Sequence, residues 1–145
     1  MRIKTKQTLV FVAALLVLVT SCSDRKSKEI CERAVVRIHD QFNAGHYHDI
    51  YAQADKCANG SEADALVWFD TVHRKLGTVK IANETEWHVD AVRSGKLVNL
   101  FYNTQFTEGN AQEHFMFFVS GDDARLHHYE IDSPLLITKS MVPCI

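Results

Sequence analysis

The segment Lys96–Ser133 constrains the fold most, because it predicts three consecutive antiparallel strands. Three runs rich in β-branched and aromatic residues are separated by two turn signals, Glu108-Gly109-Asn110 and Gly121-Asp122-Asp123. In each run one alternate set is the more apolar: Val98, Leu100, Tyr102 and Phe106, then Phe115, Phe117 and Val119, then Tyr129 and Ile131. A sheet with one apolar face needs a cover, which the amphipathic helices earlier in the chain can supply.

The start of the chain predicts a targeting segment. Three basic residues, Arg2, Lys4 and Lys6, precede an apolar stretch from Leu9 to Val19. That stretch has about 11 residues, which fits a signal peptide and falls short of the roughly 20 that a membrane-spanning helix needs. It ends in the sequence Val19-Thr20-Ser21-Cys22.

This ending resembles the lipobox of bacterial lipoproteins, in which an aliphatic residue stands three positions before a cysteine and a small residue directly before it. The resemblance implies a signal peptide over residues 1–21, cleavage before Cys22, diacylglycerol on the Cys22 thiol and acylation of the new amino terminus. Two or three acyl chains anchor a protein stably in a bilayer. The expected location is therefore the bacterial cell envelope, facing the periplasm, and Ser23 favours the outer membrane. An ordinary cleaved signal and an uncleaved anchor are the alternatives.

Residues 22–28 are polar and charged without an apolar period, so the sequence predicts a short lipid-anchored tether before a single domain over residues 29–145. Three of the 16 lysines and arginines lie in the signal peptide, which leaves 13 basic against 18 acidic residues. This excess of acidic residues opposes binding to a phosphate backbone, so nucleic acid is not expected as a partner.

Three helices are expected before the sheet. The first ends near Gly45, a cap, and carries an apolar residue at every fourth position: Ile30, Ala34, Ile38 and Phe42. A shorter helix is expected over about residues 47–54. The third begins after Ser61, a good N-cap, and ends at Gly77.

A further strand is expected between Thr78 and Arg93, with Asn83-Glu84 as an interruption. The order of three helices and then four strands predicts an α+β fold, in which N-terminal helices pack on a curved four-stranded antiparallel sheet.

Six short motifs carry a family resemblance: Phe42-Asn43-Ala44-Gly45-His46-Tyr47, Ile50-Tyr51, Lys75-Leu76-Gly77-Thr78-Val79, Tyr102-Asn103-Thr104-Gln105-Phe106, Glu113-His114-Phe115 and Tyr129-Glu130-Ile131. This pattern, spread over about residues 30–135, resembles the cone-shaped fold of nuclear transport factor 2 and ketosteroid isomerase, in particular small bacterial lipoproteins of unknown function in that group. The motifs contain no catalytic signature, and this fold hosts enzymes, binding proteins and assembly domains alike.

Three cysteines remain after Cys22, in a compartment where disulfides form. From Cys31 the first helix rises roughly 20 Å, and the second helix and loop return a similar distance, so Cys57 comes back level with Cys31. A Cys31–Cys57 bridge is the favoured pairing, with Cys31–Cys144 as the rival. The remaining thiol either pairs with another protein or stays unpaired.

Eight histidines raise the question of a metal site, but no pattern among them predicts one. His46 and His48 lie at a helix start without a third ligand nearby, so solvated turn residues are the favoured interpretation. His127 and His128 are adjacent on a strand and point to opposite faces. No metal and no cofactor is expected.

An acid–base site inside the cone is a catalytic hypothesis, because ketosteroid isomerase-like cones hold carboxylates and a tyrosine. The candidates are Asp90, Glu113, His114, His128, Tyr47 and Tyr51. By alternation Glu113 shares a face with Phe115 and His114 shares the other with Met116, and the sequence leaves open which set faces the cone. No residue matches a catalytic pattern, so no catalytic residue is predicted.

The sequence-based candidates for a ligand cleft are Trp87, Tyr102, His114, Phe117 and Tyr129, although core packing is the simpler interpretation of most aromatic side chains. The expected function is a membrane-anchored, non-enzymatic binding module, for instance an envelope immunity or inhibitor protein or a scaffold. Its expected partners are the membrane, through Cys22, and an envelope protein or a second copy of the chain at the sheet face. The rival function is an isomerase- or hydrolase-like enzyme, or a ligand carrier, using the cone pocket.

Overall fold

A computed structural model describes residues 4–55 and 60–136, and for residues 4–22 it describes the backbone alone. Three helices precede four strands: α1 (Lys4–Asn43), α2 (Tyr47–Ala52), α3 (Glu62–Leu76), β1 (Val79–Val92), β2 (Gly95–Phe106), β3 (Asn110–Ser120) and β4 (Asp123–Asp132). The predicted α+β class and the order of helices and strands are confirmed.

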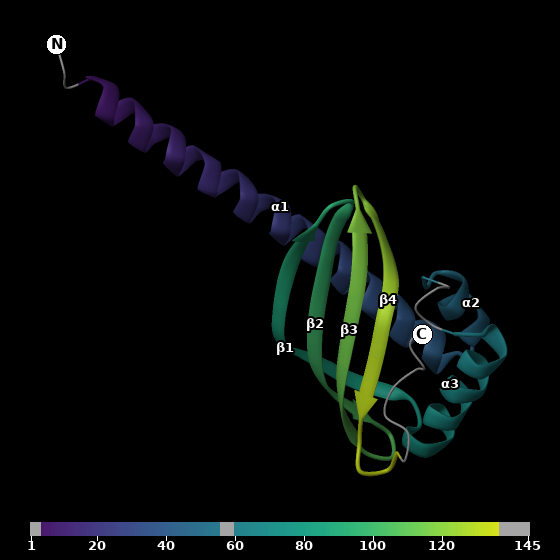
Figure 1. Ribbon diagram of the computed structural model, residues 1–145. Coiled ribbons are helices and arrows are strands. Elements are labelled where there is room, and N and C mark those ends of the chain that lie inside the picture. The colour runs from purple at the N-terminus through teal and green to yellow at the C-terminus, as the bar shows by residue number, and fades with distance from the viewer. Residues whose placement is uncertain (1–3, 56–59, 137–145) are drawn as a thin grey trace.

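The four strands form one antiparallel sheet in the order β1-β2-β3-β4. Figure 1 shows that this sheet is curved and that α1 crosses behind it, while no helix of the described chain crosses its front. We call the face turned to the helices, which includes Leu100 and Phe115, the covered face. The opposite face, which includes Phe101 and His114, is the open face.

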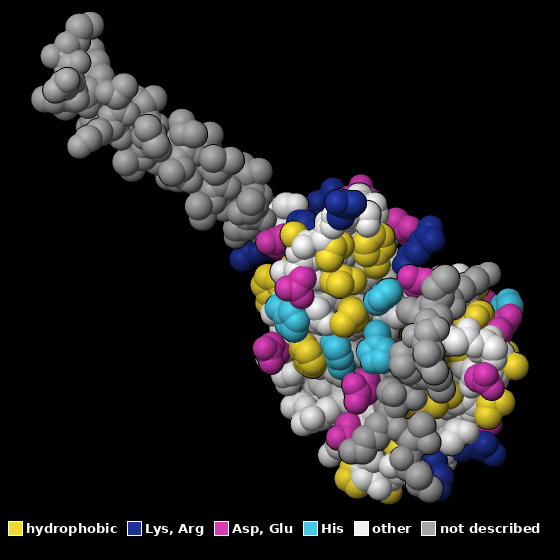
Figure 2. Space-filling model, in the orientation of Figure 1, with side chains coloured by type: hydrophobic (Ala, Val, Ile, Leu, Met, Phe, Trp, Pro, Cys, Tyr) yellow, Lys and Arg dark blue, Asp and Glu magenta, His cyan; other side chains and the backbone are white. Residues whose placement is uncertain are grey.

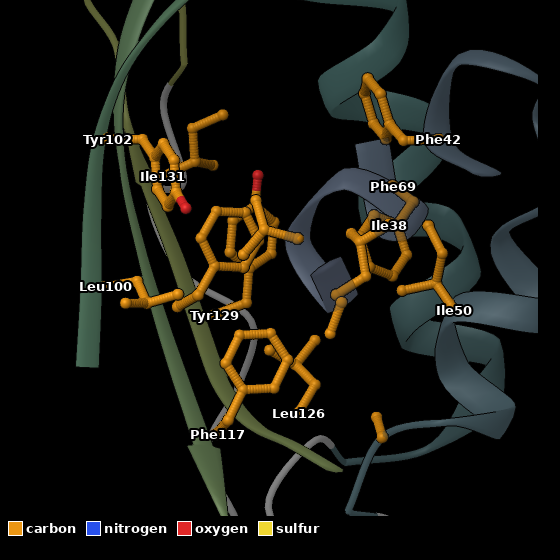
Figure 3. Close-up of a cluster of buried hydrophobic side chains, with 14 of the residues drawn as sticks. Ile38, Phe42, Ile50, Phe69, Leu100, Tyr102, Phe117, Leu126, Tyr129 and Ile131 are labelled. Atoms are coloured by element: carbon orange, nitrogen blue, oxygen red, sulfur yellow. The ribbon is translucent and has the colours of Figure 1, made fainter. Parts of the chain in front are cut away.

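The core lies between the helices and the covered face (Figure 3). Its sheet residues include all members of the apolar alternation, namely Val98, Leu100, Tyr102, Phe106, Phe115, Phe117, Val119, Tyr129 and Ile131. Leu126 of β4 joins them beyond a register shift against β3. Phe115 and Tyr129 stack at 4.6 Å between ring centroids, and Tyr129 in turn stacks on Phe69 of α3 at 6.3 Å. Each large apolar side chain buried in this way stabilises the fold by about 1.5–3 kcal/mol.

Helix α3 begins and ends where the sequence predicts. The Ser61 hydroxyl accepts a hydrogen bond from the backbone N–H of Asp64 at 3.2 Å, which satisfies a free donor of the first turn. Gly77 ends the helix with φ of 76°, and a Cβ atom there would lie 1.7 Å from Thr107 Oγ1. Only glycine therefore fits at the junction between α3 and β1.

Strand β1 continues through the expected interruption at Asn83-Glu84. Its register against β2 shifts between Glu84 and Glu86, so the strand bends at a bulge and pairing resumes beyond it. Turn-forming residues here mark a bulge and not the end of a strand.

Helix α1 also continues through residues 23–28, for which the sequence predicts a tether. Lys96 Nζ lies 2.7 Å from Asp24 Oδ1, and Lys28 Nζ lies 2.8 Å from Glu84 Oε1. Ser27 is buried. This segment therefore packs on β1 and β2, through contacts between residues distant in sequence that a local polar pattern cannot reveal.

Candidate functional site

The sheet distributes the sequence-predicted cleft residues over both of its faces. Tyr102, Phe117 and Tyr129 are buried in the core, whereas His114 lies on the open face. Trp87 lies at the β1 edge of the covered face, 42% exposed, with Lys28 Nζ 5.5 Å from its ring centroid. The structure does not bring these five residues together in one cleft.

The structure decides which residues of β3 face the interior, a question that the sequence leaves open. Glu113 points into the interior and is only 2% exposed, while His114 and Met116 point to the open face. His128 pairs with Met116 across β3 and β4, on that same open face. Asp90 is exposed on β1.

Glu113 is the centre of a buried polar network. The Tyr129 hydroxyl donates to its Oε1 at 2.5 Å, the Thr104 hydroxyl donates to its Oε2, and His39 Nε2 lies 3.1 Å from that second oxygen. Burial, reinforced by the neighbouring Glu113 carboxylate, raises the pKa of Tyr129 well above its ordinary value. Burial likewise raises the pKa of Tyr102, whose ring packs edge-on against His39.

The hydrogen bonds of this network indicate that Glu113 stabilises the fold. A general base must reach a substrate proton, whereas both oxygens of Glu113 already accept hydrogen bonds from buried protein groups. Tyr47 and Tyr51 do not join the network, because Tyr47 Oη lies 2.5 Å from His73 Nδ1 and the Tyr51 hydroxyl donates to the Gly60 carbonyl.

The open face carries a row of rings that crosses all four strands. We call it the ring row: His88 on β1, Phe101 on β2, His114 on β3 and His128 on β4. The centroid distances along it are 5.8, 4.3 and 6.1 Å, and the planes of Phe101 and His114 differ by only 5°. Figure 2 shows histidine side chains grouped among hydrophobic ones on this face.

Apolar side chains extend the ring row toward one end of the sheet. Leu97, Met116 and Phe118 are half-buried, and the register places Leu97 opposite Phe118. Asn99 lies on the same face between His88 and Met116, is 3% exposed, and its Oδ1 lies 2.8 Å from His114 Nε2. Burial first, and then the proximity of His128, lowers the pKa of His114, so its neutral form is favoured.

The other histidines of the described chain have acidic partners, except for His73, which contacts Tyr47. Among the described residues there is no group of three or more histidine, cysteine, aspartate or glutamate side chains that could hold a metal ion. His48 pairs with Glu62, and His127 Nδ1 lies 3.1 Å from Asp55 Oδ2.

Cys31 is fully buried in the core and forms no disulfide within the described residues, and burial raises the pKa of its thiol to about 12. Its predicted partners Cys57 and Cys144, and the side chain of Cys22, lie outside the described residues. Both bridges and the lipidation therefore stay predictions.

A scan against protein-family models and a search of curated proteins both find no match to this chain. Within the described residues, no helix is sufficiently long and apolar to cross a bilayer.

Two residues of the buried polar network around Glu113 were not predicted from the sequence. His39 does not belong to any motif, and the motif that contains Thr104 assigns it no role, so only the fold brings the two residues to Glu113. One signal was available for His39, because it stands four positions after Val35 on the buried side of α1. A polar residue on an apolar stripe needs a buried partner.

Proposed function

We propose that this protein is a membrane-anchored, non-enzymatic binding module of a bacterial cell envelope, and that it binds a partner protein with the open face of its sheet. The ring row, together with its half-buried apolar neighbours on a face that no described helix covers, carries this proposal. Large exposed apolar patches commonly mark interaction sites. The lipobox-like sequence supports the anchor, and the arrangement of helices and sheet is consistent with a nuclear transport factor 2-like fold.

The packing of the interior favours binding over catalysis. The core residues fill the space between α1, α3 and the covered face with stacked aromatic rings (Figure 3). A substrate that used Glu113 as a base would have to displace hydrogen bonds from Tyr129 or Thr104. Replacing such bonds leaves buried donors unpaired, which costs free energy.

The charges around the ring row indicate the chemistry of the partner. Glu86 and Asp90 on β1 and Glu130 on β4 flank the rings, and Arg125 at the far end is paired with Asp123 at 3.0 Å. A partner with an apolar centre and basic residues around it would complement this face. A second copy of the chain would instead bring acidic residues against acidic residues, so a different envelope protein is the favoured partner.

Site-specific photo-crosslinking in the cells of origin tests this proposal. A benzoylphenylalanine at Phe118 of the full chain is expected to form one predominant adduct with an envelope protein. The matched position is Val67, which is 66% exposed on α3 and should not form that adduct. Substituting Phe101→Asp should abolish the Phe118 adduct without lowering the amount of folded protein. Equal adducts from both positions, or none from Phe118, would contradict the proposal.

A further inference from the structure

Five side-chain amides gather on the open face, next to the ring row and toward the turn between β2 and β3. They belong to Asn83, Asn103, Gln105, Asn110 and Gln112, and together they line a cleft of about 870 Å³. We call it the amide cleft.

The register explains why the amides meet. Asn83 pairs with Asn103, and Asn103 pairs with Gln112, which makes one row across three strands. Gln105 and Asn110 pair with one another in a second row, two residues further along. The residue between the rows on β2, Thr104, is buried against the core, so its two neighbours point to the open face.

The amides of this cleft are available to a ligand. All five residues are exposed, and none of their side-chain amides hydrogen-bonds to another residue in the described part of the chain. Each amide offers one carbonyl acceptor and two N–H donors. Side-chain amides can therefore pair with peptide groups, donating to the carbonyl and accepting from the N–H.

The spacing of the amides matches an extended peptide. Same-face residues of a strand recur at about 6.8 Å, which is the interval between Asn103 and Gln105 and between Asn110 and Gln112. In an extended peptide lying along β2 and β3, every second peptide group faces the same side and recurs at that same interval. Alternate peptide groups can therefore meet successive amides.

The other residues that line the amide cleft indicate which class of ligand it can bind. Asp132 is the single charged residue of the cleft's described lining, which argues against a highly charged ligand. No aromatic residue is part of that lining, whereas sugar rings are commonly held by stacking on aromatic side chains. Ile81, Pro134 and Leu136 offer apolar contacts for small side chains.

We propose that the amide cleft binds an extended, uncharged peptide segment through its backbone. This inference deepens the proposed function and rests on it, because it assigns a ligand class to one end of the same open face. The peptide segment would belong to the partner whose apolar surface covers the ring row.

Nuclear magnetic resonance of the full chain in lipid nanodiscs tests the inference, because side-chain amide groups give their own signals. The probe is the blocked peptide acetyl-Thr-Ala-Thr-Ala-Thr-amide, which is uncharged and whose threonines favour an extended backbone. Saturable shifts are expected for the amide signals of Asn103, Gln105 and Gln112. The signals of Asn43 and Gln53, whose amides bond to Val79 and Asp49, should not move.

A double variant and a matched control sharpen the test. Asn103→Thr with Gln112→Thr removes two facing amides and should weaken peptide binding at least about tenfold. Glu86→Thr, on the same face outside the cleft, should leave the affinity unchanged. The inference is overturned if the peptide gives no saturable shift, or if a neutral tetrasaccharide shifts these signals and the peptide does not.

The two experiments distinguish a failure of the peptide-binding proposal from a failure of the proposed function. If the Phe118 adduct forms but the peptide does not bind to the amide cleft, the proposed ligand class is wrong and the proposed binding function still stands. Peptide binding without any Phe118 adduct would support the cleft and contradict the ring row as the partner surface.

Discussion

Replacing Glu113 with alanine is expected to destabilise the protein by at least about 3 kcal/mol. The substitution removes the acceptor of three buried groups: the hydroxyls of Tyr129 and Thr104 and the imidazole of His39. Each buried polar group left without a partner costs about 1–3 kcal/mol, and the empty space left by the side chain adds to the loss. Because domains of this size are stable by about 5–15 kcal/mol, the variant should be close to unfolding.

Urea denaturation followed by circular dichroism measures this loss on the chain from Ser23. With a slope of about 1–3 kcal/mol per molar urea, a loss of about 3 kcal/mol or more should lower the midpoint by at least about 1 M. Tyr129→Phe removes a single donor, so it should cost about 1–2 kcal/mol. Because the two side chains share a hydrogen bond, the double variant should lose less stability than the two single variants added together.

A loss below about 1 kcal/mol for Glu113→Ala would refute this reasoning, because removing a buried carboxyl group with three partners should destabilise the protein by more than that. Additive losses in the double variant would show that Tyr129 and Glu113 do not interact.

Three further predictions concern ionisation and anchoring. Burial holds the pKa of Tyr102 and Tyr129 above the ordinary 10.0, so their stabilising effect is complete below pH 10 and is lost as the pH rises. Absorbance titration should therefore show these phenols ionising only as the protein unfolds. Burial and His128 lower the pKa of His114 below 6.5, although Glu130 opposes them, so its imidazole signals should titrate with a midpoint below 6.5. Stability should fall as the pH drops below 6.5, because the unfolded chain then binds the proton more readily, and His114→Gln should remove that part of the pH dependence. Cys22→Ala should abolish the mass of the acyl chains and move the protein out of the membrane fraction, as mass spectrometry and fractionation can show.

Local signals predicted the secondary structure because they act over short distances. The Ser61 side chain and the Gly77 backbone limit α3, and alternation from Val98 to Ile131 predicts strands with one more apolar face. The path of residues 23–28 escaped prediction, because it depends on Lys96 and Glu84 far along the chain.

The candidate sites were less predictable than the fold, because both faces of the sheet are partly apolar. Phe101 and Phe118 on the open face resemble Phe115 and Phe117 on the covered one, so the sequence could not decide where Glu113 points. The amide cleft forms through the pairing of strands, which brings together residues as far apart in the sequence as Asn83 and Gln112.

Histidine labelling with diethyl pyrocarbonate tests most directly whether a partner occupies the open face in the envelope. The rates of modification of individual histidines are compared between intact cells and the purified full chain. His88 and His48 are a matched pair, because their side chains are 49% and 72% exposed and they lie on the open face and on α2 respectively. We predict that His88 and His128 react more slowly in cells while His48 reacts equally in both. Equal rates for all three histidines would contradict a bound open face.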